Sequence, residues 1–352
     1  MRLTSRVALL AAAALGVVAC GSDGDDDAEA GGGSITLMTH DSFNASDDVL
    51  AGFTDETGIE VEILRAGDAG AALNQAILTR DNPEADVFFG VDNTFLSRAV
   101  DADLFVPYES PALDEIDQAF AIDDEHRVTP VDYGDVCVNY DREYFSAAGI
   151  PPPRTIDDLA RPDYRDLLVV QNPATSSPGL AFMLATVDRF GADGFLDFWA
   201  DLRANGVLVS DGWEDAYFGQ FSGGSGEGSR PLVVSYASSP PAEVLGLDPP
   251  PAESPTAVVD DGCFRQIEFA GILNGAANED GARRFVDFLL SPEFQADLPL
   301  NMFVFPVRPD TELPEVFVTH AVLPADPVTV DPGEIGANRD EWIEEWTDTV
   351  LR

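Results

Sequence analysis

The sequence SITLMT at residues 34–39 begins the stretch that decides the fold class. A helical pattern follows over residues 47–57. Two more apolar strands are predicted at residues 60–64 and 85–90, with a second helix, residues 71–79, between them. Alternation of strands and helices is typical of an α/β domain with a largely parallel sheet. The sequence therefore predicts an α/β fold.

Polar residues follow each of these three strands. Ligands of open α/β sheets bind beyond the carboxyl ends of the strands. The side chains at these ends are therefore candidate ligand contacts: His40, Asp41, Ser42, Asp68, Asp92 and Asn93.

Two long extended runs, residues 129–140 and 261–270, are interpreted as strands that cross between two lobes, out and back. Between them the polar loop 172–179 opens a helix. Hydroxyl residues and free N–H groups at a helix start suit an anion or another polar group. Simple N-capping explains Ser176 and Ser177 equally well.

Two further stretches place aromatic residues at the edges of predicted elements. Residues 210–217, SDGWEDAY, have helix-start chemistry, and residues 232–236, LVVSY, form a short strand that breaks into hydroxyl residues. Trp213 and Tyr236 are therefore placed where a ring can face a cleft, although aromatic residues more often belong to a core. The Gly- and Ser-rich residues 222–230 between them are interpreted as a surface insertion.

The composition excludes one class of ligand. The chain of 352 residues is long enough for two domains, and its net charge is −45, from 64 acidic residues against 19 basic ones, all arginine. Nucleic-acid binding is excluded, because no basic stripe can displace counterions from phosphates. The negative charge could attract cationic ligands. However, the acidic residues are spread along the whole chain, so the simpler explanation of the charge is that the organism has an acidic, lysine-poor proteome. The scattered His40, His126 and His320 form no metal-ligand pattern, and no cofactor is expected.

The first residues indicate export and a lipid anchor. Two arginines precede an apolar run at residues 7–18, which is too short for a stable membrane span. Residues 1–19 are interpreted as a signal peptide, because VVACG around Cys20 looks like a bacterial lipobox. Residues 20–33 are then the lipid anchor and an acidic flexible tether on the outer face of the cytoplasmic membrane.

Two cysteines remain after such processing, Cys137 and Cys263. In an oxidising space outside the cytoplasm they suggest a disulfide, worth about 4 kcal/mol if unstrained because it closes a long loop. Two buried free thiols, or one reactive thiol, are the alternatives.

Near the end of the chain, Trp342 and Trp346 lie one turn apart on a predicted helix, residues 338–351, and are interpreted as packing residues.

Taken in order, these motifs resemble the extracytoplasmic solute-binding proteins of ABC importers, and within that family they look most like the thiamine-binding members. THDSF at residues 39–43 is similar to the opening of those proteins, and ADVFFGVDN at residues 85–93 to a second motif. The resemblance covers about residues 35–352. Further motifs match in order and spacing at residues 132–134 (DYG), 175–179 (TSSPG), 211–217 (DGWEDAY), 235–240 (SYASSP) and 261–268 (DGCFRQIE).

The resemblance implies a two-lobed periplasmic-binding-protein fold of the type II, Venus-flytrap kind, with the ligand cleft between the lobes. Lobe 1 would comprise residues 34–131 and 264–310, lobe 2 residues 132–263, and residues 311–352 a helical closing segment. It implies no enzymatic activity. The expected ligand is thiamine or a thiamine phosphate, delivered by a monomer to the permease and ATPase subunits of an ABC importer.

The resemblance also implies a site, residue by residue. Trp213 and Tyr236 match aromatic residues that line the thiamine pocket, and Asp68 matches an acid that contacts the ligand. His40 stands where relatives often have Tyr, and Ser176 and Ser177 lie in the loop that takes polar or phosphate groups. The full set of expected ligand contacts is His40, Asp41, Ser42, Asp68, Asp92, Asn93, Tyr133, Ser176, Ser177, Trp213, Tyr217, Tyr236, Ser238, Ser239 and Phe303.

The chain departs from the family pattern at two aromatic positions. Phe303 stands where some relatives have Trp, and Ala242 where some have Tyr. The aromatic cage is therefore either looser or rebuilt from Phe43 or Tyr217.

Three other functions compete with thiamine binding. A polyamine would suit the acidity. Iron-binding relatives of this fold use adjacent tyrosines, whereas Tyr236 is followed by Ala237. A thiamine-degrading enzyme of similar fold would use Cys137 as its nucleophile, which requires a base and exposure, but Cys137 lies in an apolar strand with Cys263 as a possible partner.

Overall fold

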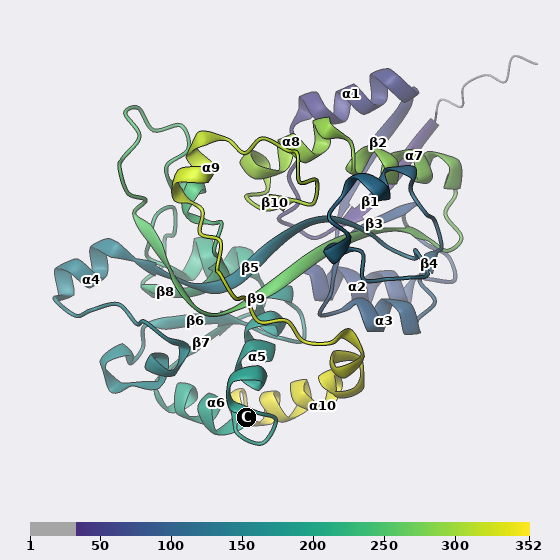
Figure 1. The fold of residues 1–352 in the computed structure, drawn as a ribbon. Helices are drawn as coiled ribbons and strands as arrows, with labels where there is room; N and C mark the ends of the chain where they lie inside the picture. Colours follow the sequence, from purple (N-terminus) through teal and green to yellow (C-terminus); the bar gives the residue numbers. More distant parts are fainter. Residues whose placement is uncertain (1–32) are drawn as a thin grey trace, which may run out of the picture.

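The computed structural model describes residues 33–352, whose strands form one 10-stranded sheet (Figure 1). The predicted signal peptide, Cys20 and nearly all of the predicted tether lie outside the described residues. Within that described part, no helix has the length and apolar character needed to cross a membrane.

The elements alternate as the sequence predicts, and most boundaries agree to within two residues. The strands are β1 (Gly33–Thr39), β2 (Ile59–Arg65), β3 (Val87–Asp92), β4 (Phe105–Val106), β5 (Thr129–Asp141), β6 (Leu168–Gln171), β7 (Leu208–Ser210), β8 (Leu232–Tyr236), β9 (Thr256–Leu273) and β10 (Phe305–Pro306). The α-helices are α1 (Asp47–Thr57), α2 (Ala69–Leu78), α3 (Leu96–Asp101), α4 (Arg142–Ala148), α5 (Ser177–Phe190), α6 (Phe195–Ala204), α7 (Glu279–Leu289), α8 (Pro292–Asn301), α9 (Glu315–His320) and α10 (Pro332–Val350). Short 3₁₀ turns and one π-helical turn, Asp215–Gln220, complete the chain.

The sheet consists of two parallel groups joined by two long antiparallel strands. The strand order is β2-β1-β3-β9-β5-β8-β6-β7. β1 runs parallel to β2 and β3, and β6 runs parallel to β7 and β8, while β9 is antiparallel to both β3 and β5. β5 and β9, the two predicted crossing strands, therefore connect a β2-β1-β3 group to a β8-β6-β7 group (Figure 1).

Helix α1 illustrates how local sequence fixes an element. Ser46 caps its start by accepting a backbone N–H, and Gly58 ends it in the left-handed conformation, at φ 71°. The predicted bounds, residues 47–57, are confirmed. Phe53, on its buried face, packs edge-to-face on Phe285 of α7, with ring centroids 5.2 Å apart. This contact lies in a core between α1, α7, α8 and one face of the β2-β1-β3 group.

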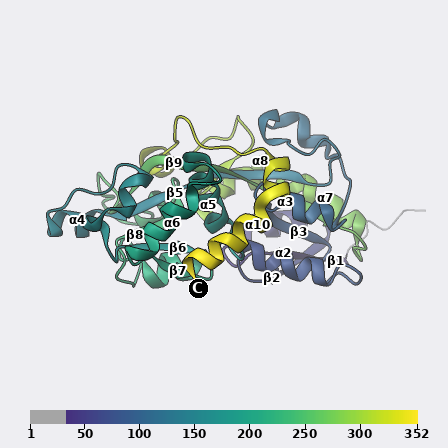
Figure 2. The same ribbon diagram turned by 90° about the horizontal axis from the view of Figure 1, so that it is seen from below.

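Helix α10 packs on two helices, α3, which follows β3, and α6, which precedes β7. Figure 2 shows it along the underside of the molecule, where it packs on α6 and on α3. Trp346 is fully buried against Trp199 of α6, with ring centroids 5.3 Å apart, and Gly336 lies close to Ser97 of α3. Trp342 is also buried, so the interpretation of the tryptophan pair as packing residues is confirmed.

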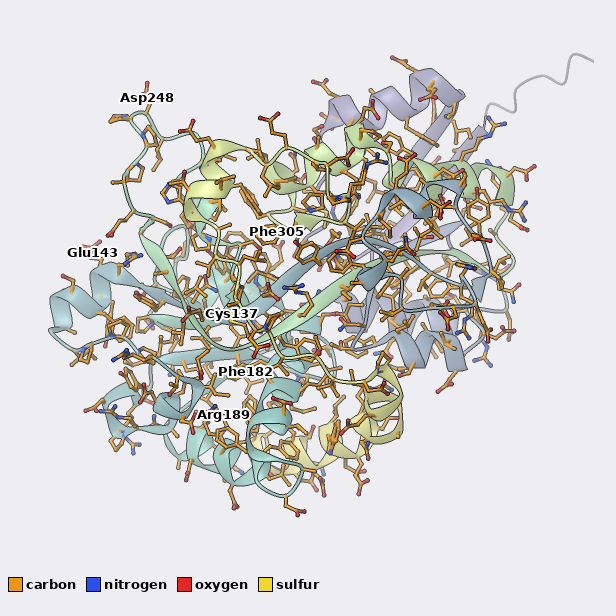
Figure 3. The ribbon with its side chains drawn as sticks, in the orientation of Figure 1. Cys137, Glu143, Phe182, Arg189, Asp248 and Phe305 are labelled. Atoms are coloured by element: carbon orange, nitrogen blue, oxygen red, sulfur yellow. A yellow bond between two sulfur atoms is a disulfide. The ribbon has the colours of Figure 1, made fainter. Side chains whose placement is uncertain are left out.

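A disulfide joins the two crossing strands. Cys137 of β5 is bonded to Cys263 of β9, near the centre of the molecule in Figure 3. Both sulfur atoms lie in a small apolar cluster with Ala237, which follows β8. The covalent link spans a sequence separation of 126 residues, which removes much of the conformational freedom of the unfolded chain.

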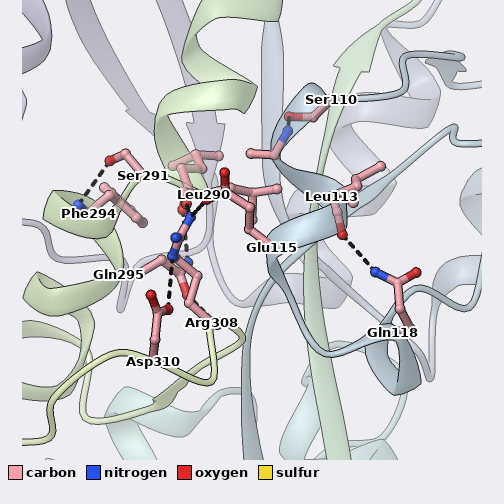
Figure 4. Close-up of polar contacts among 12 residues, drawn as sticks. Ser110, Leu113, Glu115, Gln118, Leu290, Ser291, Phe294, Gln295, Arg308 and Asp310 are labelled. Atoms are coloured by element: carbon pink, nitrogen blue, oxygen red, sulfur yellow. Dashed lines mark hydrogen bonds and ion pairs between the residues drawn. The ribbon is translucent and has the colours of Figure 1, made fainter.

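A buried arginine fastens the segment after β10 to its surroundings (Figure 4). The guanidinium of Arg308 forms an ion pair with Glu115, contacts Asp310 at 3.3 Å and donates to the carbonyl of Leu290 at 3.1 Å. Gln295 of α8 accepts from the Arg308 backbone N–H at 3.2 Å. Charge-assisted hydrogen bonds of this kind hold the chain beyond β10 against the end of α7 and the first half of α8.

Candidate functional site

A pocket lies where loops from the two parallel groups meet. The loops after β1 and β2 contribute on one side, and the loops after β6, β7 and β8 on the other. This is the position at which open α/β sheets bind ligands. Nine of the residues expected from the sequence line the pocket: His40, Ser42, Asp68, Ser177, Trp213, Tyr217, Tyr236, Ser239 and Phe303.

Trp213 is the fixed centre of the aromatic wall. Tyr217 stacks on its indole ring at 5.0 Å between centroids and 21° between planes. Its Nε1–H donates to the Ser235 hydroxyl at 2.9 Å, and Phe218 contacts it edge-on. Tyr217 therefore covers one face of the indole ring.

Tyr236 approaches the wall from β8, with its ring centroid 6.5 Å from that of Trp213. Its hydroxyl donates to Oε1 of Gln266 at 3.2 Å. Burial raises the pKa of this phenol well above 10, so the ring remains neutral. A side chain at Gly134 of β5 would meet the tyrosine ring at 2.9 Å, which explains the glycine at this position.

Asp68 connects the two sides of the pocket. It is the N-cap of α2, and its Oδ1 accepts from the Ala69 N–H at 2.6 Å. Its Oδ2 accepts from the backbone N–H of Trp213, on the opposite side, at 2.7 Å. Burial raises the pKa of this carboxyl, while the hydrogen bonds from Trp213 and Ala69 oppose that change.

A histidine and a glutamate, His40 and Glu268, are paired in the lining of the pocket. Nε2 of His40 lies 3.1 Å from Oε1 of Glu268, and both side chains are nearly buried. Burial lowers the pKa of His40, but the charge and hydrogen bond of Glu268, together with the charges of Asp68 and Asp41, outweigh burial and raise the pKa above 6.5. Behind them, Asp132 is fully buried, and burial followed by repulsion from Glu268 raises its pKa well above the usual value.

Six expected residues do not line the pocket: Asp41, Asp92, Asn93, Tyr133, Ser176 and Ser238. Asp41 accepts from the Gly67 N–H at 3.1 Å and so ties two loops together. Asn93 bridges β3 to β9 through the Arg265 carbonyl and the Ile267 N–H. These side chains support the walls.

The other four have contacts of their own outside the lining. Asp92 is buried and accepts from the backbone N–H and hydroxyl of Thr94 at 2.8 and 2.5 Å. Tyr133 stacks on Phe120 and Phe305, beneath the guanidinium of Arg265. Two hydroxyl residues, Ser176 and Ser238, are fully buried.

Phe43, suggested as a substitute aromatic, is buried in the core at an edge-to-face contact with Phe89. It does not line the pocket. Of the two suggested substitutes, only Tyr217 does.

Several lining residues were not expected from the sequence. The Gly- and Ser-rich residues 222–230 were interpreted as a surface insertion, but Ser225 lines the pocket, so that interpretation is incomplete. Gly226 and Gly228 lie against the backbone of residues 217–221, too close for side chains, which folds the loop inward. The other unexpected polar members are Glu214, Glu243, Gln266, Glu268 and Asn301.

The comparisons with known proteins agree with this architecture. Residues 82–323 match the family model described as bacterial extracellular solute-binding protein. The chain belongs to this family. As a solute-binding protein it is not an enzyme, and the sulfur of Cys137, bonded to Cys263, is not available as a nucleophile.

This solute-binding protein has a relative in Escherichia coli named thiamine-binding periplasmic protein, 30% identical over 322 residues, which are 90% of this chain and 94% of the relative. A solved structure titled periplasmic thiamin binding protein is 28% identical, with a TM-score of 0.79, covering 91% of this chain and 96% of that one. Iron-bound HitA from Pseudomonas aeruginosa, 18% identical over 90% of this chain and 99% of its own, has a TM-score of 0.69 and shares the fold alone. The predicted α/β periplasmic-binding-protein fold is confirmed.

Proposed function

We propose that this protein binds thiamine outside the cytoplasmic membrane and delivers it to an ABC importer. The observation that carries the proposal is the pairing of a rigid aromatic wall, centred on Trp213, with the carboxyl groups of Asp68 and Glu268 in one pocket. Thiamine joins an aminopyrimidine to a permanently cationic thiazolium. Both parts of the molecule suit such a pocket. The names of the relatives support this ligand.

The aromatic wall supplies attraction for the cation. A cation held over an aromatic face gains roughly 1–2 kcal/mol when it is desolvated. The rings of Trp213, Tyr236 and Phe303 all line the pocket, which supports such contacts. The carboxylate of Glu268 can accept from the exocyclic amine and offset the ligand charge.

Closure of two lobes would bury the ligand and present one closed shape to the permease and ATPase subunits. In this proposal lobe 1 is residues 34–131 with 264–310, lobe 2 is residues 132–263, and residues 311–352 close the assembly. Lipidation at Cys20 would hold the protein at the outer face of the membrane.

Ligand-dependent thermal unfolding tests the proposal against its rivals. Thiamine at about one hundred times its dissociation constant should add roughly 2.7 kcal/mol of stability. Spermidine and ferric citrate, the probes for a polyamine and for iron, should leave the midpoint unchanged. Stabilisation by spermidine alone would favour a polyamine carrier, which the acidic lining makes the second candidate.

A further inference from the structure

The side chain of Tyr236 reaches from β8 across β5 to β9. Tyr236 lies opposite Val136 of β5, whereas its hydroxyl donates to Oε1 of Gln266 on β9 at 3.2 Å. The ring lies over Gly134 of β5, where a side chain would come within 2.9 Å of it. Gly134 and Gln266 are opposite each other in the ladder between β5 and β9. The place of this pocket residue therefore depends on how these two strands are held together.

The ladder between β5 and β9 is interrupted close to these contacts. Its register shifts between Val136 and Val138, and the single residue between them, Cys137, faces residues 260–263 of β9. Extra residues on one strand disrupt the hydrogen bonds of a ladder locally. The disulfide from Cys137 to Cys263 lies at this irregularity. A covalent bond therefore joins the two strands where their backbone pairing is broken.

An ion pair lies between the disulfide and the contacts of the tyrosine ring. Asp135 and Arg265 occupy the ladder position next to that of Gly134 and Gln266. Nε of Arg265 lies 2.6 Å from Oδ1 of Asp135, which is buried. One ionic and one covalent link therefore hold β5 against β9 beside the residues that contact Tyr236.

We propose that the disulfide between Cys137 and Cys263 is a positioning element of the pocket: it holds β5 against β9 and thereby fixes the ring of Tyr236 in the lining. The inference rests on the proposed function. A cross-link that only constrained the unfolded chain would raise stability and leave the affinity of the folded protein unchanged. A change in affinity therefore distinguishes positioning from a purely stabilising role.

Calorimetric titration of thiamine into the wild type and into Cys137→Ala/Cys263→Ala tests this. Loss of the disulfide should weaken binding by about fivefold, because the ring of Tyr236 is no longer pre-organised for the ligand. Alanine suits the apolar cluster around the two sulfur atoms. Cys137→Val/Cys263→Ala, which refills part of that cluster, is the second variant if the alanine pair does not fold.

Phe53→Leu is the matched control for a general loss of stability. Phe53 packs on Phe285 between α1 and α7, and it does not line the pocket. This substitution should lower the midpoint of thermal unfolding, as loss of the disulfide should, and keep the wild-type affinity.

The Tyr236→Ala background tests the route from the disulfide to the ligand. With the ring absent, the disulfide has no pocket residue to position, so its removal should change the affinity by less than about twofold. A loss of the same size with and without Tyr236 would overturn the proposed route. Equal affinities of the wild type and the disulfide-free variant would overturn the inference as a whole.

Hydrogen exchange of the ligand-free protein separates the inference from the proposed function. Without the disulfide, residues 260–268 of β9 should exchange faster, because the strand is held less firmly against β5. Unchanged exchange there would overturn the inference, whatever the protein binds. A wild-type protein that binds no thiamine would remove the proposed function, and the exchange would still decide whether the disulfide holds the two strands.

Discussion

Oδ2 of Asp68 accepts a 2.7 Å hydrogen bond from the backbone N–H of Trp213. The carboxylate caps α2, beside the β2-β1-β3 group, whereas Trp213 follows β7, the outermost strand of the other group. A contact from the Ala71 N–H to the Thr175 carbonyl, 3.3 Å long, crosses the same cleft. The residue that starts a helix on one side therefore fixes the aromatic wall on the other.

Replacing the Asp68 carboxylate should weaken thiamine binding more than it weakens folding. Asp68→Asn keeps a capping oxygen but loses the charge-assisted bond to Trp213, so affinity should fall by about tenfold. Asp68→Ala should bind more weakly still and lose about 1 kcal/mol of stability with the cap. Calorimetry and urea unfolding measure the two effects.

Ser46→Ala is the matched control, because Ser46 caps α1 and does not line the pocket. It should lose about 1 kcal/mol of stability and keep its affinity. If Asp68→Asn binds thiamine as tightly as the wild type, the hydrogen bond from Trp213 to Asp68 does not contribute to thiamine binding.

The ion pair of His40 and Glu268 should make thiamine binding depend on pH. The raised pKa of His40 means that its charge persists above pH 6.5 and is lost as pH rises through the folded-state value. Its loss leaves Glu268, with Asp68 and Asp41 nearby, uncompensated, so affinity for a cation should rise with pH.

Titrations from about pH 6 to about pH 8.5 measure this change. His40→Gln should bind thiamine tightly at every pH in this range, because glutamine does not titrate. The stability contribution of the pair has the opposite trend: it is complete below the unfolded-state value near pH 6.5 and disappears as pH rises. Thiamine affinity that falls with pH in the wild type would contradict the account.

The sequence could predict the fold because each strand and helix carries its own local signal. Short apolar runs, caps such as Ser46 and stops such as Gly58 mark the elements. Trp213 and Tyr236 could be placed because they stand at element edges that meet at one end of the sheet. These are properties of neighbouring residues in the chain.

The rest of the site depends on tertiary contacts that have no local signal. Tyr133 lies in a strand that is buried on both faces, so alternation could not show that it stacks on Phe305. Ser225 belongs to a loop without periodicity, whose inward fold follows from close backbone packing at Gly226 and Gly228. Glu268 of β9 pairs with His40, which follows β1, only because Gly90 of the intervening strand β3 leaves room for the imidazole ring.

Burial of Asp92 should make the protein less stable as pH rises from about 4 to about 6. Burial raises the pKa of this carboxyl to about 6, despite the hydrogen bonds that it accepts from Thr94. The folded protein therefore holds a proton that the unfolded chain has released, and stability falls across this window by roughly 3 kcal/mol.

Urea unfolding of Asp92→Asn across the same window should lack this slope, because the amide keeps an acceptor for Thr94 without titrating. Asp101→Asn, at an exposed carboxylate of α3, is the control and should retain it. An identical pH dependence in wild type and Asp92→Asn would rule out Asp92 as its source.

The most direct test of the account is calorimetric titration of thiamine into the wild-type protein and into Trp213→Ala. We expect one thiamine per chain, with binding weakened by roughly 2 kcal/mol or more in the variant, as for a buried aromatic anchor. Trp213→Phe should recover part of that loss, because it retains a ring opposite Tyr217. Thiamine that does not bind the wild type, or that binds Trp213→Ala equally well, would contradict the account.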